Sequence, residues 1–97
     1  YSASKAGLAH LTRHMAATLA GAHITVNCIA PGVFPSRMTR FLFDDSHPAH
    51  EPIQDIPLGR PGEADDICGA VLYLSSKAGA YVTGVLLPVS GGLATID

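Results

Sequence analysis

The sequence has little charge, no excess of basic residues and no long apolar run, and each absence excludes a class of protein. Charged residues make up 14% of the 97 positions, with six Lys and Arg against eight Asp and Glu. A nucleic-acid or membrane-surface partner requires a basic field, which a net charge of −2 does not provide. No apolar stretch reaches the roughly 18 residues that a membrane-spanning helix needs. We therefore expect no nucleic-acid partner and no membrane partner.

Cysteine is also scarce. Cys28 and Cys68 are the two cysteines of the chain, and both lie within apolar runs. This placement predicts two buried thiols and fits a reducing compartment, so we expect a cytoplasmic protein. The low charge, together with 47% hydrophobic residues, suggests that other protein covers much of the surface.

The first element predicted is a helix over residues 2–20, which contain no proline and a single internal glycine. Its large apolar residues recur in steps of three and four, as on the buried face of a helix. This predicted buried stripe consists of Leu8, Leu11, Met15 and Leu19. Gly21 follows as the expected C-cap.

Two short apolar runs, residues 24–30 and 85–89, predict strands that are buried on both faces, as parallel strands are. A second helix is expected between them, over residues 63–75, with acidic residues in its first turn that favour the positive helix end. The acids are Glu63, Asp65 and Asp66, and the expected inner stripe is Ile67, Ala70, Val71 and Leu74. Residues 33–60 are irregular, with a short helix expected around 37–43, and connections of this length often serve as lids or binding loops.

The order helix, strand, loop, helix, strand predicts an α/β fold with a parallel sheet. Both strands have the composition of interior strands, which need neighbours and covering helices on each side. Two strands and two helices do not supply them. We therefore expect the chain to form the end of a larger sheet.

The opening residues YSASK allow two catalytic interpretations. Ser2 and Lys5 fit S-x-x-K, in which a lysine activates a serine nucleophile, but the accompanying S-D-N and K-T-G tripeptides do not occur in the sequence. Tyr1 and Lys5 are four positions apart and share one helical face. Tyrosine has a pKa of about 10, and a neighbouring ammonium favours the phenolate. The second pair is therefore suited to proton transfer at a carbonyl or alcohol oxygen.

A second candidate segment follows the first predicted strand. Pro31 and Gly32 come directly after its carboxyl end, where open α/β sheets bind ligands. Gly32 has no Cβ, so its backbone can approach a flat ring closely. Ser36, in the next turn, offers a hydroxyl to a carboxamide. Pro-Gly also simply ends strands, but its combination with Y-x-x-x-K favours a ligand site.

In combination, these motifs resemble the carboxyl-terminal part of a short-chain dehydrogenase/reductase. The resemblance rests on the Tyr1–Lys5 pair, N-x-I-A-P-G, I-P-L-G-R-x-G-E and the closing Gly-Gly, and extends to about residue 93. The stretches APGVFPSRMT and IPLGR look most like 3-oxoacyl-carrier-protein reductases and rhamnolipid-type ketoacyl reductases. The resemblance implies the carboxyl-terminal portion of a doubly wound, Rossmann-type parallel sheet. Residues 1–97 would be a partial dinucleotide-binding domain with its amino-terminal half missing.

The resemblance also implies roles for individual residues. Tyr1 matches the proton donor to the substrate carbonyl, and Lys5 matches the lysine that lowers the tyrosine pKa and holds the nicotinamide ribose hydroxyls. The residues that match the loop against the nicotinamide are Pro31, Gly32 and Phe34. Ser36 stands where the family usually has a carboxamide-binding threonine, so the hydroxyl is kept.

The implied activity is reduction of a carbonyl, that of a 3-oxoacyl thioester in fatty acid metabolism, by hydride transfer from NADP or NAD, with NADP favoured and no metal. The implied parent is a homo-oligomer, a dimer or tetramer. In the family the phosphate-binding loop and catalytic serine precede the tyrosine, so we expect the isolated 97 residues to be inactive. The alternative is a truncated family member that acts only as an oligomerisation or interaction piece.

Two further groups leave alternatives open. His10 and His14 share a helical face and would suit a metal, but no acidic or cysteine partner is evident, so a solvated or subunit-facing stripe is preferred. An apolar cluster after Pro31-Gly32 is either a lid and substrate wall or part of the core. It consists of Phe34, Met38, Phe41, Leu42 and Phe43.

Overall fold

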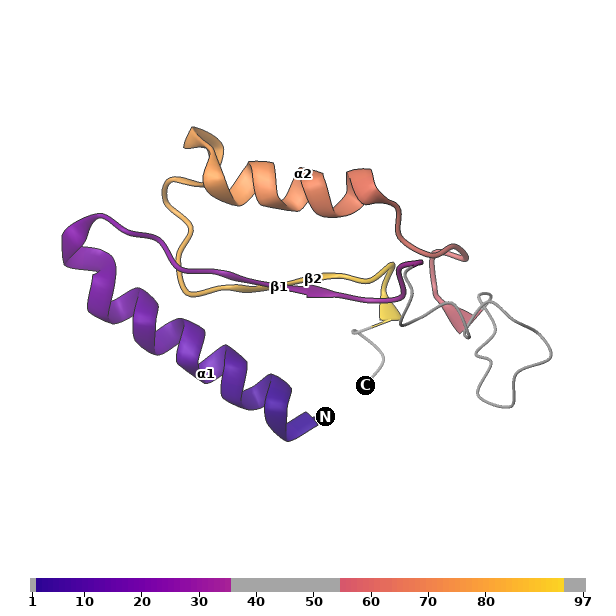
Figure 1. Cartoon of the computed structure of the whole chain (residues 1–97), viewed down its shortest axis with the longest axis horizontal. Helices are drawn as coiled ribbons and strands as arrows, with labels where there is room; N and C mark the ends of the chain where they lie inside the picture. Colours follow the sequence, from indigo (N-terminus) through magenta and orange to yellow (C-terminus); the bar gives the residue numbers. More distant parts are fainter. Residues whose placement is uncertain (1, 36–54, 94–97) are drawn as a thin grey trace. The chain divides into compact units, whose positions relative to one another are not determined.

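The computed structural model describes residues 2–35 and 55–93. Along the chain, helix α1 (Ser2–Leu19) and a short 3-10 helix η1 (Ala20–Ala22) precede strand β1 (Cys28–Pro31). Helix α2 (Ala64–Ser75), the 3-10 helix η4 (Lys77–Gly79) and strand β2 (Leu86–Val89) follow (Figure 1). This order confirms the predicted α/β class. The short helix expected around residues 37–43 lies outside the described residues.

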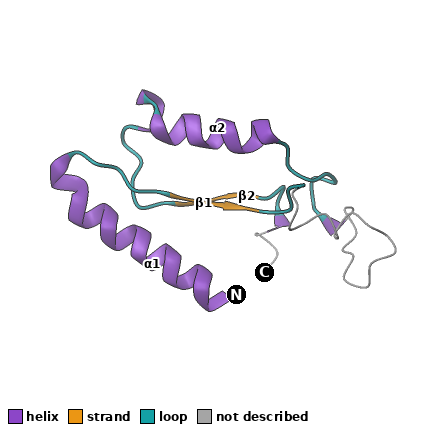
Figure 2. Ribbon diagram, viewed as in Figure 1, coloured by secondary structure: helices purple, strands orange, loops and turns teal. Residues whose placement is uncertain are grey.

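Strands β1 and β2 pair in parallel, as predicted. The Cys28 N–H donates to the Val85 carbonyl and the Gly32 N–H donates to the Val89 carbonyl, both at 2.9 Å. Both strands advance in the same direction between these two bonds, which is the parallel pattern. The connection from β1 to β2 carries α2, as a crossover between parallel strands usually does (Figure 2).

The chain divides into two compact units. The first unit contains Tyr1–Ala30 and Gly69–Leu87, and the second contains Pro31–Cys68 and Pro88–Asp97. Each unit is described by itself. Within the described ranges, no helix is long and apolar enough to cross a membrane.

In the first unit, the buried face of α1 differs from the predicted stripe. Leu8 and Leu11 are each 50% exposed and Met15 is 40% exposed, while Leu19 is half-buried. The buried positions are Thr12 and Ala16, which follow one another at a helical step of four. The prediction that the large apolar residues mark the buried face was therefore wrong.

One of the two buried residues described in α1, Ala16, lies next to the segment that leads into β2. A Cβ built on Gly84, just before β2, would lie 3.4 Å from the Ala16 Cβ. This separation is an ordinary van der Waals contact, so a Cβ would fit at position 84, where the positive φ of 78° is what favours glycine. The Thr12 hydroxyl donates to the Leu8 carbonyl at 2.8 Å, so this buried polar group has a partner within its own helix.

The end of α1 also differs from the prediction, which placed the C-cap at Gly21. The helix tightens into η1, and Gly21 lies within it. His23 then takes the left-handed conformation, with φ 61°, and its N–H donates to the Ala20 carbonyl at 3.0 Å. Histidine tolerates this conformation better than branched residues do, so the turn does not require a glycine there.

The strands are shorter and more exposed than the predicted runs 24–30 and 85–89. Strand β1 begins at Cys28, its first three residues are half-buried and Pro31 is exposed. Strand β2 alternates exposed and half-buried residues, so burial on both faces was wrong for it. The reason is that, within the described residues, each strand has one neighbour.

Residues before β1 are joined to the segment before β2 by side chains as well as by the backbone, where the Gly84 N–H donates to the Val26 carbonyl at 2.7 Å. The Asn27 carboxamide donates from Nδ2 to the Val82 carbonyl and accepts at Oδ1 from the Val85 N–H, each at 3.1 Å. The Val26 N–H donates to the Thr83 hydroxyl at 3.0 Å. A single amide thus satisfies one donor and one acceptor of the opposite backbone.

Helix α2 follows its predicted bounds to within one residue. Three of its expected inner residues, Ile67, Ala70 and Leu74, are half-buried, whereas Val71 is 46% exposed. Cys68 is exposed and Cys28 is half-buried, so the prediction of two buried thiols was wrong. Cys68 directly follows Ile67, and one helical step turns it about 100° away from the inner face.

Candidate functional site

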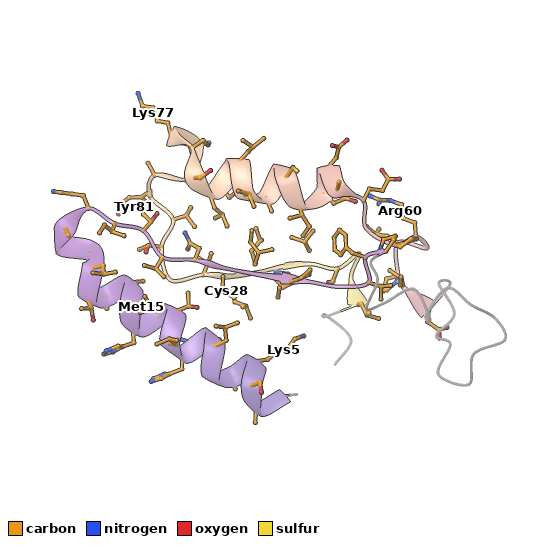
Figure 3. All side chains as sticks on the ribbon, viewed as in Figure 1. Lys5, Met15, Cys28, Arg60, Lys77 and Tyr81 are labelled. Carbon is orange, nitrogen blue, oxygen red and sulfur yellow. The ribbon has the colours of Figure 1, made fainter. Side chains whose placement is uncertain are left out.

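The structure places the predicted site residues in different parts of the chain. Tyr1 and Ser36 lie outside the described residues. Lys5 is half-buried on α1, in the first unit (Figure 3). The remaining three, Pro31, Gly32 and Phe34, share one short segment at the carboxyl end of β1, in the second unit. Residues 31–35 are called the β1 loop below.

Gly32 joins the β1 loop to the end of β2. Its N–H donates to the Val89 carbonyl at 2.9 Å. A Cβ built on Gly32 would lie 2.8 Å from both the Cα and the Cβ of Ser90, a separation that real side chains do not show. The sequence suggested that Gly32 permits approach to a flat ring. The structure adds a packing reason for glycine, which is the closeness of the neighbouring chain.

Gly62 holds the other side of the β1 loop. Its N–H donates to the Val33 carbonyl at 2.9 Å. The space that a Gly62 Cβ would need is occupied by the ring of Phe34, whose Cε2, Cζ and Cδ2 atoms are the nearest neighbours. Two consecutive residues of the β1 loop therefore contact one glycine.

Arg60 and Asp66 form a two-pronged ion pair across the start of α2. The Arg60 Nη1 donates to Asp66 Oδ2 at 2.9 Å and Nη2 donates to Oδ1 at 3.3 Å. Nη1 also donates to the Pro61 carbonyl at 3.0 Å, and Asp66 Oδ2 accepts the Glu63 N–H at 2.7 Å. The turn that leads into α2 is thereby closed at both ends by one carboxylate.

These contacts shift the acid–base behaviour of both groups. The hydrogen bonds from the Arg60 side chain and the Glu63 backbone lower the pKa of the Asp66 carboxyl below its ordinary value. The hydrogen bond and the charge of Asp66 raise the pKa of Arg60. The pair is therefore ionised throughout the neutral range, although both side chains remain partly exposed.

The Gly91-Gly92 stretch packs against residues 56–58. Both glycines have positive φ, 64° and 95°. A Cβ on Gly91 would lie 2.9 Å from Ile56 Cγ2, and the Gly91 carbonyl accepts the Leu58 N–H at 2.9 Å. Ile56 is the buried apolar residue of the second unit among the residues described, so the closing glycines cover its small core.

A cavity of about 410 Å³ lies within the second unit, lined mainly by apolar groups. Its volume is within the range of roughly 300–1,000 Å³ typical of small-molecule sites. The β1 loop contributes Val33 and Phe34 to the cavity wall. The polar residues of the wall include Arg60, Asp66 and Ser90. The arrangement places an apolar loop and a fixed cation at the carboxyl end of the parallel strands, the usual ligand-binding edge of an α/β sheet.

Sequence reasoning had missed the connection between Arg60, Gly62 and Asp66. The motif I-P-L-G-R-x-G-E indicates no role for Arg60, and Asp66 is one of several acids at a predicted helix start. A carboxylate in the third position of a helix often bonds back to the N–H at its start, which was the available signal for Asp66. No sequence signal marks Gly62, because glycine is required there by the ring of Phe34, which belongs to another segment.

Comparison with known proteins identifies the class. A family model described as enoyl-(acyl carrier protein) reductase matches residues 1–94. The chain therefore belongs to this family of short-chain dehydrogenases/reductases, as the resemblance predicted. A rhamnolipids biosynthesis 3-oxoacyl-(acyl-carrier-protein) reductase of Pseudomonas aeruginosa is 45% identical over 92 residues, 95% of this chain and 36% of that protein. The corresponding reductase FabG of Escherichia coli is 42% identical over 93 residues, 96% of this chain and 37% of that protein.

Solved structures agree. The Pseudomonas aeruginosa RhlG/NADP active-site complex matches with TM-score 0.83 and 44% identity, over 96% of this chain and 38% of that one. A blue fluorescent protein from a metagenomic library, in complex with NADPH, matches with TM-score 0.82 and 37% identity, over 97% of this chain and 37% of that one. The chain thus spans little more than a third of the length of these relatives.

Proposed function

We propose that this chain is the carboxyl-terminal third of an NADP-dependent reductase that converts the carbonyl of a 3-oxoacyl thioester to an alcohol. The observation that carries the proposal is the family match over residues 1–94, which includes Tyr1 and Lys5. Relatives named as 3-oxoacyl-(acyl-carrier-protein) reductases support the substrate class. Structural neighbours with bound NADP and NADPH support the cofactor.

The residues of the β1 loop fit a nicotinamide group. Val33 and Phe34 line a mainly apolar cavity at the carboxyl end of β1, and an aromatic ring with an apolar strand end suits a flat ring ligand. Pro31, Gly32 and Phe34 would contact the nicotinamide, and the Ser36 hydroxyl would bind its carboxamide.

In the proposed reaction, Tyr1 donates a proton to the carbonyl oxygen as that oxygen gains negative charge. The ammonium of Lys5 favours the tyrosine phenolate left behind. It also binds the ribose hydroxyls and so holds the cofactor in position. Bound reduced nicotinamide supplies the hydride. The protein therefore provides the proton and the orientation of the cofactor.

The parent is proposed to be a cytoplasmic homo-oligomer, and residues 1–97 a partial dinucleotide-binding domain within it. Relatives more than twice as long as this chain support the partial-domain part of the proposal. By itself the 97-residue chain is expected to lack dehydrogenase activity and to bind NADPH weakly, because the phosphate-binding loop of the family is not among its residues. A non-catalytic interaction piece is the alternative.

The test measures NADPH oxidation at 340 nm by the complete protein that contains this chain, with an acetoacetyl thioester as substrate. Turnover with NADPH, and less with NADH, is expected. No turnover with 3-oxoacyl thioesters of several chain lengths would overturn the substrate class, and failure to bind either cofactor would overturn the reductase assignment. Micromolar NADPH binding by the isolated 97 residues would contradict the expectation that they are inactive alone.

A further inference from the structure

The β1 loop is held from two sides within the second unit. On one side, Gly32 donates to Val89 and packs against Ser90. On the other side, Gly62 donates to the Val33 carbonyl and makes room for the ring of Phe34. The conformation of the loop therefore depends on where Gly62 lies.

The position of Gly62 is set in turn by Arg60 and Asp66. Gly62 lies between Arg60 and Glu63, and Asp66 binds the side chain of the first and the N–H of the second. Arg60 also donates to the Pro61 carbonyl, so the residue before Gly62 is held as well. The planar guanidinium makes two parallel bonds to the carboxylate, a geometry that an ammonium cannot reproduce.

From these contacts we propose that Arg60, Asp66 and Gly62 are positioning residues, which hold Phe34 where it contacts the nicotinamide and thereby set the affinity for the cofactor. The second part of this inference, the effect on cofactor affinity, rests on the proposed function. The first part, that the ion pair and Gly62 hold the Phe34 ring, does not depend on any cofactor.

The first measurement needs no cofactor. The complete protein is labelled with 4-fluorophenylalanine, and the resonance of Phe34 is assigned by its loss in Phe34→Leu. Arg60→Met, Asp66→Asn and Gly62→Ala are each expected to shift or broaden that resonance. An unchanged Phe34 resonance in these three variants would overturn the inference.

Matched controls separate positioning from general damage. Asp65→Asn removes the neighbouring acid of the same helical turn, and Gly69→Ala adds a Cβ where nothing lies within 4 Å. Both are expected to keep the wild-type Phe34 resonance and wild-type kinetics. Changes in the controls as large as those in the variants would show that any substitution in α2 has this effect, and would overturn the specific role.

The second measurement is the split between KM and kcat for NADPH. Arg60→Met, Asp66→Asn and Gly62→Ala are expected to raise KM for NADPH about tenfold with a smaller loss of kcat at saturation. Arg60→Lys keeps the charge but not the two parallel hydrogen bonds of the guanidinium. Its KM for NADPH is expected to lie between those of Arg60→Met and the wild type. A displaced Phe34 resonance with unchanged KM would overturn the link to the cofactor.

A double variant distinguishes loss of the Gly62–Phe34 contact from general misfolding. Gly62→Ala is expected to be harmful when Phe34 is present and nearly harmless in a Phe34→Ala background, because the added methyl then meets no ring. Equal effects of Gly62→Ala in both backgrounds would contradict the contact. If the wild-type protein binds no NADPH while its Phe34 resonance still responds to the variants, the proposed function fails and the holding of Phe34 stands.

Discussion

A Cβ on Gly32 would lie 2.8 Å from the Cα and the Cβ of Ser90, so the β1 loop and the end of β2 approach as closely as backbones permit. The obstructing atoms belong to the backbone and to a Cβ, which cannot rotate out of the way. This contact makes position 32 specific for glycine independently of any ligand.

Gly32→Ala is therefore expected to lower the free energy of unfolding by about 1–3 kcal/mol, the usual cost of forcing extra volume into a filled site. Urea unfolding measures the change. Gly7→Ala is the matched control, because nothing lies within 4 Å of its Cβ position on α1 and alanine favours helix by about 1 kcal/mol. Equal stability of Gly32→Ala and wild type would contradict the packing argument.

Asn27→Ala should cost about 2 kcal/mol in the free energy of unfolding, because it leaves the Val82 carbonyl and the Val85 N–H without their partner. Thermal or urea unfolding gives the value. Thr18→Ala is the control. The Thr18 hydroxyl donates only to the His14 carbonyl of its own helix and is exposed, so its loss should change stability by less than about 0.5 kcal/mol. Similar costs for the two variants would refute the role of the Asn27 carboxamide in joining the two segments.

The pH dependence of the second unit should include Asp66. Its pKa is lowered by Arg60 and by the Glu63 N–H, so the ion pair is complete above the ordinary carboxyl pKa of about 3.9 and is lost as the pH falls through the lowered value. In Arg60→Met, the pKa of Asp66 should rise towards its ordinary value. Carbon-13 titration of the carboxyl measures this. Lys77→Met, which removes a cation beyond the far end of α2, should leave the pKa of Asp66 unchanged. An equal rise of the Asp66 pKa in this control would show that the net charge of the protein, and not the contact with Arg60, sets the pKa.

Tyr1→Phe in the complete protein should lower kcat about 10²- to 10⁴-fold while NADPH binding persists, because the ring remains and only the proton donor is lost. Steady-state kinetics and cofactor fluorescence measure the two effects separately. Ser2→Ala is the control for the rival Ser2–Lys5 interpretation and should keep activity. Loss of activity in Ser2→Ala with retention in Tyr1→Phe would reverse the assignment of the opening motif.

Much of the fold could be predicted from local sequence. Proline-free segments of helix-favouring residues have a strong preference of their own, which is why the bounds of α2 and the start of α1 were predicted to within one residue. The buried face of α1 could not be predicted from the helix alone, because Ala16 on that face meets Gly84, a residue far away in the sequence. The left-handed turn at His23 was missed because η1 postpones the end of the helix by three residues.

The candidate site was predictable where its residues are consecutive. Pro31, Gly32 and Phe34 lie on one segment, and a Pro-Gly after a strand is a local signal. The Arg60–Asp66 pair spans six positions across a turn, which is not a helical spacing, so the sequence carries no periodic signal for it. The contact between Gly62 and Phe34 depends on two segments that meet only in the folded chain.

The pairing of Asn27 with Val85 joins residues that are 58 positions apart. A ribosome adds about 5–20 residues per second, so some 3–12 s pass before the partner of Asn27 has been synthesised. During this interval β2 is not yet available to pair with β1, and contacts that distant in sequence also form slowly afterwards. The pairing of β1 with β2 is therefore a late event relative to the synthesis of β1 itself.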